Sequence, residues 1–277
     1  MIAILGTGLL GANFARALIA KGETVHVWNR TFERATALEA DGAKAFANAA
    51  DAVKGASRTH IVVKDDDAVE GVLAAAKFAP GSLVIDHTTT SPGGSKARSA
   101  RTDITYVHAP VFMGPQNARE STGIMMVSGE RARIERVTPM LSPMTGKLVD
   151  LGDRADAAAC FKLMGNTFLM GFTAAIADLI GLGKALGISA SDAVGLFEHF
   201  NPGALAPQRA KRMATGEFSP ASWELAMARK DARLVQAEVD RAHVALVLVP
   251  AIAKRMDEMI EQGHAHDDWT VIAKDLV

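Results

Sequence analysis

A lysine and an asparagine four residues apart, Lys162 and Asn166, lie near the start of a long apolar segment. Residues at this spacing share one helix face, so the ammonium and the amide point to the same side. Partial burial of such a lysine lowers its pKa toward the range that a general acid needs. His87 and His108 are alternative proton donors. A lysine that extends along the helix surface into water is an equally good interpretation of the spacing alone.

The N-terminal stretch carries three glycines in the spacing of a phosphate-binding turn. Gly6-Thr7-Gly8-Leu9-Leu10-Gly11 follows an apolar run and opens a helical pattern. The first glycine permits a tight turn, the second lets a pyrophosphate approach the backbone, and the third lets the helix pack close to the strand. The helix N-terminus presents free N–H groups to phosphates. We therefore predict a dinucleotide site that includes Gly6, Gly8, Leu9, Leu10 and Gly11.

The end of the second predicted strand indicates which dinucleotide binds. An NAD site normally has Asp or Glu there, bound to the ribose hydroxyls, whereas this chain has Asn29, Arg30 and Thr31. A carboxylate would repel a 2′-phosphate, and Arg30 would attract it, with Arg34 one helical turn later. The sequence predicts NADP(H), although a solvated surface arginine is the alternative interpretation of Arg30.

Other predicted strands end in polar or small residues. Ligands of a doubly wound sheet bind at the carboxyl ends of its strands. We expect Val63, Lys64 and the segments 86–89 and 109–114 to surround the nicotinamide and its ribose. The hydroxyls of Thr88 and Thr89 are also consistent with ordinary helix capping.

The composition is typical of a soluble globular enzyme. Among 277 residues, 49% are hydrophobic and 22% charged, and the formal net charge of -1 favours neither nucleic acid nor an acidic membrane. The single cysteine, Cys160, excludes an intramolecular disulfide and fits a reducing compartment. A strand that starts at Ile2 leaves no room for a signal peptide, so we expect a cytoplasmic protein. The apolar segment from Leu163 to Leu182 is predicted to be a core helix rather than a membrane span.

Strand and helix patterns alternate from Met1 to Leu151, which predicts a doubly wound, mostly parallel α/β sheet of the Rossmann type. From Asp156 onward the pattern is helical. We predict a dinucleotide-binding domain at 1–155 and an all-α domain for substrate binding and oligomerisation at 156–277. The predicted strands are 2–5, 24–28, 43–46, 59–63, 82–86, 104–108, 124–128 and 147–151, and the C-terminal helices are 157–186, 190–200, 221–242 and 250–262.

These motifs together resemble the β-hydroxyacid dehydrogenases, a 6-phosphogluconate dehydrogenase-like group that includes 3-hydroxyisobutyrate dehydrogenase and semialdehyde reductases. Asp86-His87-Thr88-Thr89 is similar to the family's D-x-S-T stretch, which implies Thr89 at the cofactor and Thr88 near the substrate. Lys162 and Asn166 match its catalytic K-x-x-x-N pair. Lys230-Asp231 matches a downstream pair whose lysine contacts the cofactor, with Asp231 on the substrate side. Gly263-His264 and Asp267-Asp268 resemble the family's C-terminal ending.

The chain departs from the family in the substrate loop. The usual A-P-V-S-G-G is here Ala109-Pro110-Val111-Phe112-Met113-Gly114. Phe112 and Met113 add bulk where a hydroxyl and close N–H groups would bind a substrate carboxylate. Either the substrate is larger or less polar, or the backbone around Gly114 still binds a carboxylate while the side chains turn into the core.

The resemblance implies an NADPH-dependent reductase that acts on a semialdehyde or a bulkier carbonyl compound. Lys162 would serve as general acid and base, so no metal is required. One alternative is imine reduction, because the related imine reductases have an apolar loop ending in Pro, as Pro115 does here, although they usually lack the lysine. Another is a non-catalytic dinucleotide-binding module. A third alternative, nucleic-acid binding through Lys211 and Arg212, competes with a solvated helix face, because their neighbours are acidic. The resemblance also implies a homodimer or homotetramer.

Overall fold

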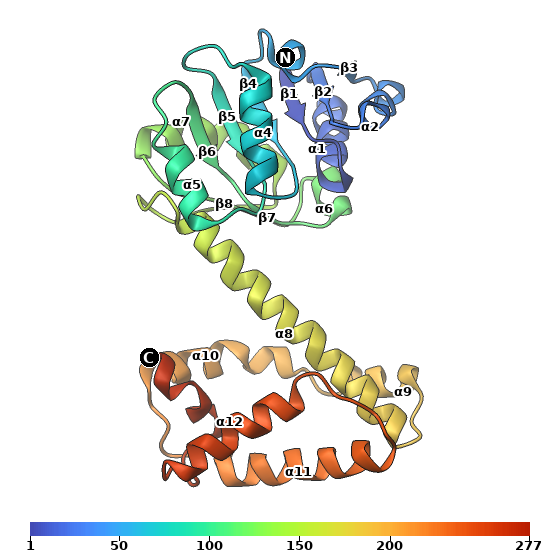
Figure 1. Ribbon diagram of the computed structural model, residues 1–277, viewed down its shortest axis with the longest axis vertical. Coiled ribbons are helices and arrows are strands. Elements are labelled where there is room, and N and C mark those ends of the chain that lie inside the picture. Colours follow the sequence, from blue (N-terminus) through green and yellow to red (C-terminus); the bar gives the residue numbers. More distant parts are fainter. The chain divides into compact units, whose positions relative to one another are not determined.

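The computed structural model describes residues 1–277, which form two compact units, Met1–Asn166 and Thr167–Val277. The first unit holds every strand, and the second is helical (Figure 1). Helix α8 (Ala157–Ala185) contributes residues to both units. The alternation of strands and helices ends where α8 begins, and the domain boundary at 155/156 stays a prediction.

Six parallel strands form the main sheet in the order β3-β2-β1-β4-β5-β6, which confirms the predicted doubly wound α/β fold. Register pairs Leu5 with Ile61, Ile61 with Asp86, and Asp86 with His108. Four strands therefore end at one edge, where ligands of such sheets bind. The strands are β1 (Ile2–Leu5), β2 (Val25–Trp28), β3 (Lys44–Phe46), β4 (Arg58–Ile61), β5 (Leu83–Asp86) and β6 (Thr105–His108).

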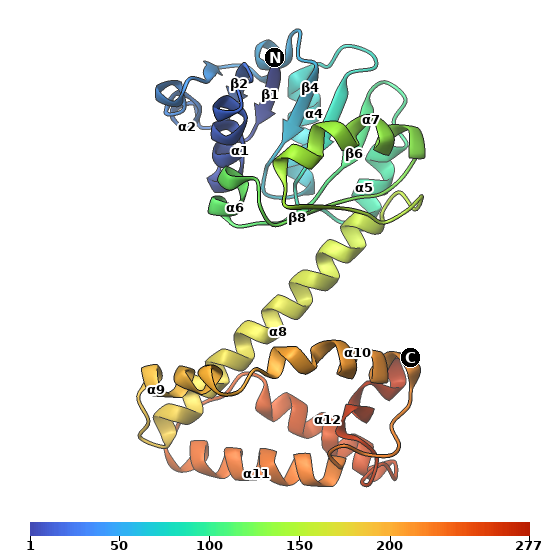
Figure 2. The same cartoon turned by 180° about the vertical axis from the view of Figure 1, so that it is seen from behind.

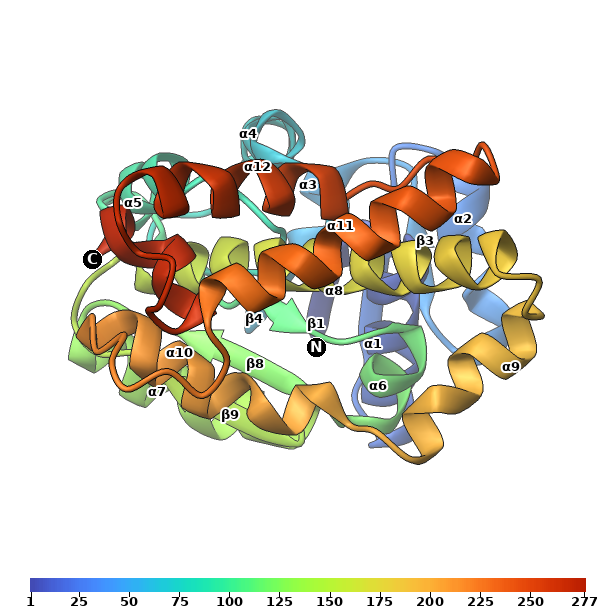
Figure 3. The same ribbon diagram turned by 90° about the horizontal axis from the view of Figure 1, so that it is seen from below.

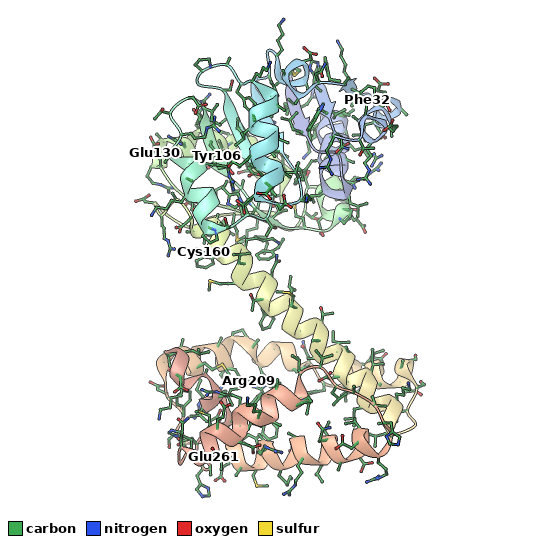
Figure 4. All side chains as sticks on the ribbon, in the orientation of Figure 1. Phe32, Tyr106, Glu130, Cys160, Arg209 and Glu261 are labelled. Atoms are coloured by element: carbon green, nitrogen blue, oxygen red, sulfur yellow. The ribbon has the colours of Figure 1, made fainter.

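Helices cover both faces of this sheet (Figures 1 and 2). Successive strand residues point to opposite faces, so Ile4 packs with Phe14 in one core while Leu5 packs with Tyr106 in the other. Figure 4 shows Tyr106 inside this unit. The helices are α1 (Leu9–Ala20), α6 (Pro115–Glu120) and α7 (Arg131–Leu141) on one side, and α3 (Ala49–Val53), α4 (Asp66–Ala76) and α5 (Pro92–Ser99) on the other, with α2 (Phe32–Thr36) and a 3-10 turn, η1 (Glu39–Asp41), before β3.

The last strands form a separate sheet, which the sequence patterns do not predict. β7 (Val111–Phe112) pairs antiparallel with β8 (Ile124–Val127), and β8 pairs in parallel with β9 (Lys147–Asp150). A two-residue strand is too short to show an alternating pattern, so β7 has no signal of its own. Its pairing holds Phe112 opposite Ile124 and fixes the substrate loop on this smaller sheet.

Helices of the second unit pack around a core that includes Leu225 and Met259, and α11 lies beside α12 (Figure 3). Buried Asp268 joins its segments: it accepts hydrogen bonds from the hydroxyls of Ser222 (2.6 Å) and Thr270 (2.7 Å) and pairs with Arg212 at 3.1 Å. Arg212 therefore has a structural role. The helices are α9 (Ala190–Gly195), α10 (Ala206–Thr215), α11 (Leu225–Arg241) and α12 (Val249–Glu261), with 3-10 turns η3 (Leu196–Glu198), η4 (Pro202–Leu205) and η5 (Trp269–Leu276).

By length and composition, α8 is apolar enough to cross a membrane. We predicted a core helix here, and within a single chain this prediction is wrong, because only 6% of its most apolar window is buried. Phe168 is 64% exposed and Met170 66%. Cys160 marks the start of this helix in Figure 4.

Candidate active site

The glycine turn leaves space for a pyrophosphate at the N-terminus of α1. A Cβ added at Gly8 would meet no atom within 4 Å, whereas one added at Gly11 would overlap the carbonyl oxygen of Gly6. Gly6 itself has a φ of 103°, which side chains rarely adopt. No side chain caps α1, so its first N–H groups remain available to an anion. These features fit the predicted dinucleotide.

Asn29 braces this turn from the end of β2. Its side-chain oxygen accepts a hydrogen bond from the Thr7 N–H (3.1 Å), and its amide nitrogen donates to the Thr31 carbonyl (2.9 Å). The amide that replaces the usual carboxylate is therefore occupied within the protein. Arg30, Thr31 and Arg34 are exposed and line the cavity beside this turn.

The loop after β5 is held by a buried polar network. The Asp86 carboxylate accepts hydrogen bonds from the Thr88 N–H (2.9 Å) and the Tyr106 hydroxyl (2.6 Å). The Thr88 hydroxyl accepts one from the Val63 N–H (3.1 Å). Thr88 is only 2% exposed, so its hydroxyl ties β4 to β5, while Thr89 is partly exposed on the cavity wall.

A cavity of about 910 Å³ opens at this edge, entirely within the first unit. It brings together most of the predicted site residues, but Phe112, Gly114, Asn166, Lys230 and Asp231 do not line it. Residues of α4 were missed, although α4 starts at the same sheet edge. The predicted lining residues are Gly6, Gly8, Leu9, Leu10, Gly11, Asn29, Arg30, Thr31, Arg34, Val63, Lys64, His87, Thr88, Thr89, Val111, Met113 and Lys162, and the others are Trp28, Val62, Asp67, Ala68, Gly71 and Val72.

Lys162 reaches this cavity from α8. Its ammonium nitrogen lies 4.1 Å from the centroid of the Phe112 ring, a favourable cation–π contact. The side chain is half-buried, and desolvation lowers its pKa below the usual value of a lysine. Gly165, one helical turn on, makes room for the ring: a Cβ there would lie 2.8 Å from Phe112 Cε1 and would overlap Cζ.

The rest of the substrate loop is tied down locally. The Gly114 N–H donates to the Asn117 side chain (2.9 Å), so this N–H is already bound. Met113 packs against the main core and also lines the cavity. Lys230, on α11 of the second unit, pairs with Asp231 at 2.9 Å, and the expected roles of these two residues stay predictions.

The two alternative proton donors are buried and already bound. His87 Nδ1 lies 2.7 Å from the Ala109 carbonyl oxygen, and His108 Nε2 lies 2.8 Å from that of Thr88. Burial lowers the pKa of His87 to about 4 and also lowers that of His108. Both rings are neutral near pH 7, so Lys162 is the stronger candidate for the acid.

Because His87 is buried and neutral, we expect the free energy of unfolding to decrease as the pH is lowered. His87 has a pKa of about 4 in the folded protein and about 6.5 unfolded, so the unfolded state binds more protons below pH 6.5. His87 alone should cost about 1 kcal/mol of unfolding free energy between pH 7 and 5.5, and about 3 kcal/mol by pH 4. Urea unfolding at each pH measures this loss. A free energy that stays constant from pH 7 to 5 would contradict the prediction.

The fold and the cavity define a dinucleotide-binding protein. Residues 1–152 match the family model described as the NAD binding domain of 6-phosphogluconate dehydrogenase. The chain belongs to this family, and its resemblance to the β-hydroxyacid dehydrogenases is confirmed.

Relatives in sequence agree with this assignment, and a solved structure shares the fold. An NAD-dependent L-serine dehydrogenase of Pseudomonas aeruginosa is 27% identical over 99% of this chain and 96% of its own. A probable 3-hydroxyisobutyrate dehydrogenase of Mycobacterium bovis is 31% identical over 68% of this chain and 66% of its own. An imine reductase from Myxococcus stipitatus, solved with NADP⁺, superposes with a TM-score of 0.92 at 18% identity over the whole of both chains, a likeness of fold.

Proposed function

We propose that this protein is an NADPH-dependent reductase of the β-hydroxyacid dehydrogenase type with Lys162 as its general acid and base. The observation that carries the proposal is the half-buried Lys162 ammonium on the wall of the cavity that begins at the glycine turn. When bound, the dinucleotide supplies the hydride.

In this proposal, Lys162 donates a proton from Nζ to the substrate oxygen as negative charge develops there. In the direction of alcohol oxidation the neutral amine accepts that proton. Because the pKa of Lys162 is lowered, the neutral amine forms at a pH closer to neutrality than in an ordinary lysine. Asn166, one turn later on α8, would orient the oxygen.

The proposed substrate is a carbonyl compound with an apolar part beside the reacting carbon. Phe112 presents its ring next to Lys162, and Met113 lines the same cavity. The Gly114 N–H is bound to Asn117, which leaves fewer backbone donors for a carboxylate. Thr88 and Asp231 are the further substrate residues that the family resemblance suggests, with Lys230 near the cofactor.

The preference for NADPH rests on Arg30 and Arg34 at the cavity rim. Arg30→Ala should weaken NADPH binding about tenfold, since a hydrogen bond to a charged group contributes about 1.5–3 kcal/mol and Arg30 is exposed. NADH binding should change less than about twofold. Fluorescence titration of both coenzymes measures the two constants. Arg119→Ala on α6 is the control, and equal losses for NADPH and NADH would contradict the assignment.

Assembly and domain roles belong to the same proposal. We infer a homodimer or homotetramer, because α8 exposes large apolar side chains such as Phe161, Phe168 and Met170 in the single chain. Residues 1–155 would bind NADP(H) in the cytoplasm, and residues 156–277 would contribute substrate contacts and oligomerisation. Light scattering after size-exclusion chromatography measures the assembly state.

The function is tested by NADPH oxidation with a matched set of substrates. The set contains short semialdehydes with a carboxylate, neutral aldehydes and ketones of similar and larger size, and cyclic imines. We expect the neutral carbonyl compounds to have the highest kcat/KM. Turnover of imines alone would identify an imine reductase, and tight NADPH binding with no turnover would favour a non-catalytic module.

A further inference from the structure

Two buried histidines connect three neighbouring strands at the wall of the cavity, which His87 also lines. His60 Nδ1 on β4 lies 2.8 Å from Nε2 of His87, which directly follows β5. The two ring planes are within 7° of parallel. The other nitrogen of His87 lies 2.7 Å from the carbonyl oxygen of Ala109, which directly follows β6. His60 is fully buried and His87 is 3% exposed, so water does not compete for these contacts.

The contact with Arg58 determines which nitrogen of each histidine carries the hydrogen. A guanidinium only donates, and Arg58 Nε donates to His60 Nε2 at 3.1 Å. His60 must therefore carry its hydrogen on Nδ1 and donate to His87 Nε2. His87 in turn carries its hydrogen on Nδ1 and donates to the Ala109 carbonyl. All three bonds run in one direction. The opposite tautomer of His60, or an added proton on either ring, would set two N–H groups against each other.

The accepting carbonyl stands at the start of the substrate loop. The Ala109 N–H donates to the Asp86 carbonyl (2.7 Å), so both polar groups of this residue are bound. Pro110 follows with a fixed φ, and Phe112 in β7 is three residues beyond Ala109. A rotation of the Ala109 peptide plane would therefore displace the Phe112 ring beside Lys162.

We propose that His60 and His87 are positioning residues, which fix the Ala109 carbonyl and thereby hold Phe112 against Lys162. For catalysis this inference rests on the proposed function, in which Phe112 borders the substrate. Neither imidazole takes part in proton transfer to the substrate. The dinucleotide turn at residues 6–11 has its own support in Asn29, so we expect the pyrophosphate contacts to remain when these hydrogen bonds are lost.

The test compares His87→Phe, His87→Asn and His26→Phe. The Phe variant keeps an aromatic ring but cannot donate, whereas the Asn side chain can donate to the Ala109 carbonyl in place of Nδ1. His26 on β2 is the control, because its Nδ1 also lies near a backbone carbonyl oxygen, that of Ala52, at 3.3 Å. We expect His87→Phe to lower kcat/KM for the carbonyl substrate about 10- to 100-fold, with NADPH affinity within about twofold. His87→Asn should recover most of the loss, and His26→Phe should change neither quantity.

Nuclear magnetic resonance provides a readout that does not need activity. Nitrogen shifts of the wild type should identify His60 and His87 as neutral Nδ1–H tautomers at pH 7. The backbone amides of Phe112 and Met113 should shift in His87→Phe and stay in place in His26→Phe. Unshifted loop amides, the opposite tautomer, or equal loss of NADPH affinity in His87→Phe and His87→Asn would overturn the inference. Wild-type protein that reduces no substrate would refute the proposed function alone, since the amide shifts would still test the positioning.

Discussion

The Lys162→Met variant is expected to reduce carbonyl substrates about 100- to 10,000-fold more slowly than the wild type, because it lacks the proton donor. Methionine keeps the length and apolar contacts of the lysine stem beside Phe112. The NADPH dissociation constant should stay within about threefold, which stopped-flow and titration measurements separate from the chemical step. In the wild type, the reduction rate should fall as pH rises through the lowered pKa of Lys162, at a pH below that of an ordinary lysine.

A lysine on the same helix provides the control for this experiment. Lys184→Met removes an exposed ammonium from the last turn of α8 and should leave kcat unchanged. A Lys162→Met variant that keeps more than about a tenth of the wild-type rate would show that another group supplies the proton. The same variant is also tested with preformed cyclic imines, to separate carbonyl reduction from imine reduction. A cyclic imine that water has protonated to an iminium ion needs no proton from the enzyme, so its reduction should not depend on Lys162.

Gly165→Ala should lower kcat/KM about 100-fold, although it adds a single methyl group. The added Cβ would overlap the Phe112 ring, so the ring must move away from α8 and from Lys162. Displacements of about 1 Å near reacting groups can cost a factor of this size. Steady-state kinetics with the best carbonyl substrate measures the loss.

A double-mutant cycle identifies the cause of that loss. In the Phe112→Ala background the ring is gone, so adding Gly165→Ala should cost less than about threefold. Gly171→Ala on the same helix is the matched control, since a Cβ there meets nothing within 4 Å. Equal losses from Gly165→Ala with and without Phe112 would show that the helix backbone, and not the ring, is the sensitive element.

Much of the first unit was predictable because its local patterns agree with its tertiary structure. The run from Ile2 to Leu5 is strand β1, and the glycine spacing marks the turn into α1. The helical pattern from Ala157 matches α8 to within one residue of its end at Ala185. The predicted helix that starts at residue 190 is α9, and Ser189 caps it by accepting a hydrogen bond from the Asp192 N–H. These elements carry strong periodicity or specific capping residues, which act over a few neighbours.

Other features depend on contacts between distant residues and leave no local signal. The small sheet forms because β7 meets β8 after a reversal of the chain, and a two-residue strand has no period. Asn29 was read as the replacement for a ribose-binding carboxylate, and its bond to the Thr7 N–H was not foreseeable. The hydrogen-bonded pair of His60 and His87 likewise depends on strand register, which only the folded sheet defines.

The residues on the cavity wall were easier to predict from the sequence than the contacts between them. Strand ends located Val63, Thr89 and Met113 correctly on its wall. The roles of Phe112 and Gly165 emerge only together, because the aromatic ring needs the space that the glycine leaves on another element. The family pattern has Ser where this chain has Phe112, so the pattern could signal a change there but not its partner.

The separate pairing of β7, β8 and β9 has a consequence for how this protein can diverge. The glycine turn and Arg30 follow strands of the six-stranded sheet, whereas Phe112 belongs to the three-stranded one. Substitutions in the smaller sheet can change the loop without altering the strand register that forms the dinucleotide turn. A library within residues 111–127 therefore leaves the glycine turn unchanged, provided that Val111 and Met113, which line the dinucleotide cavity, are kept, and it is a rational place to search for new substrates.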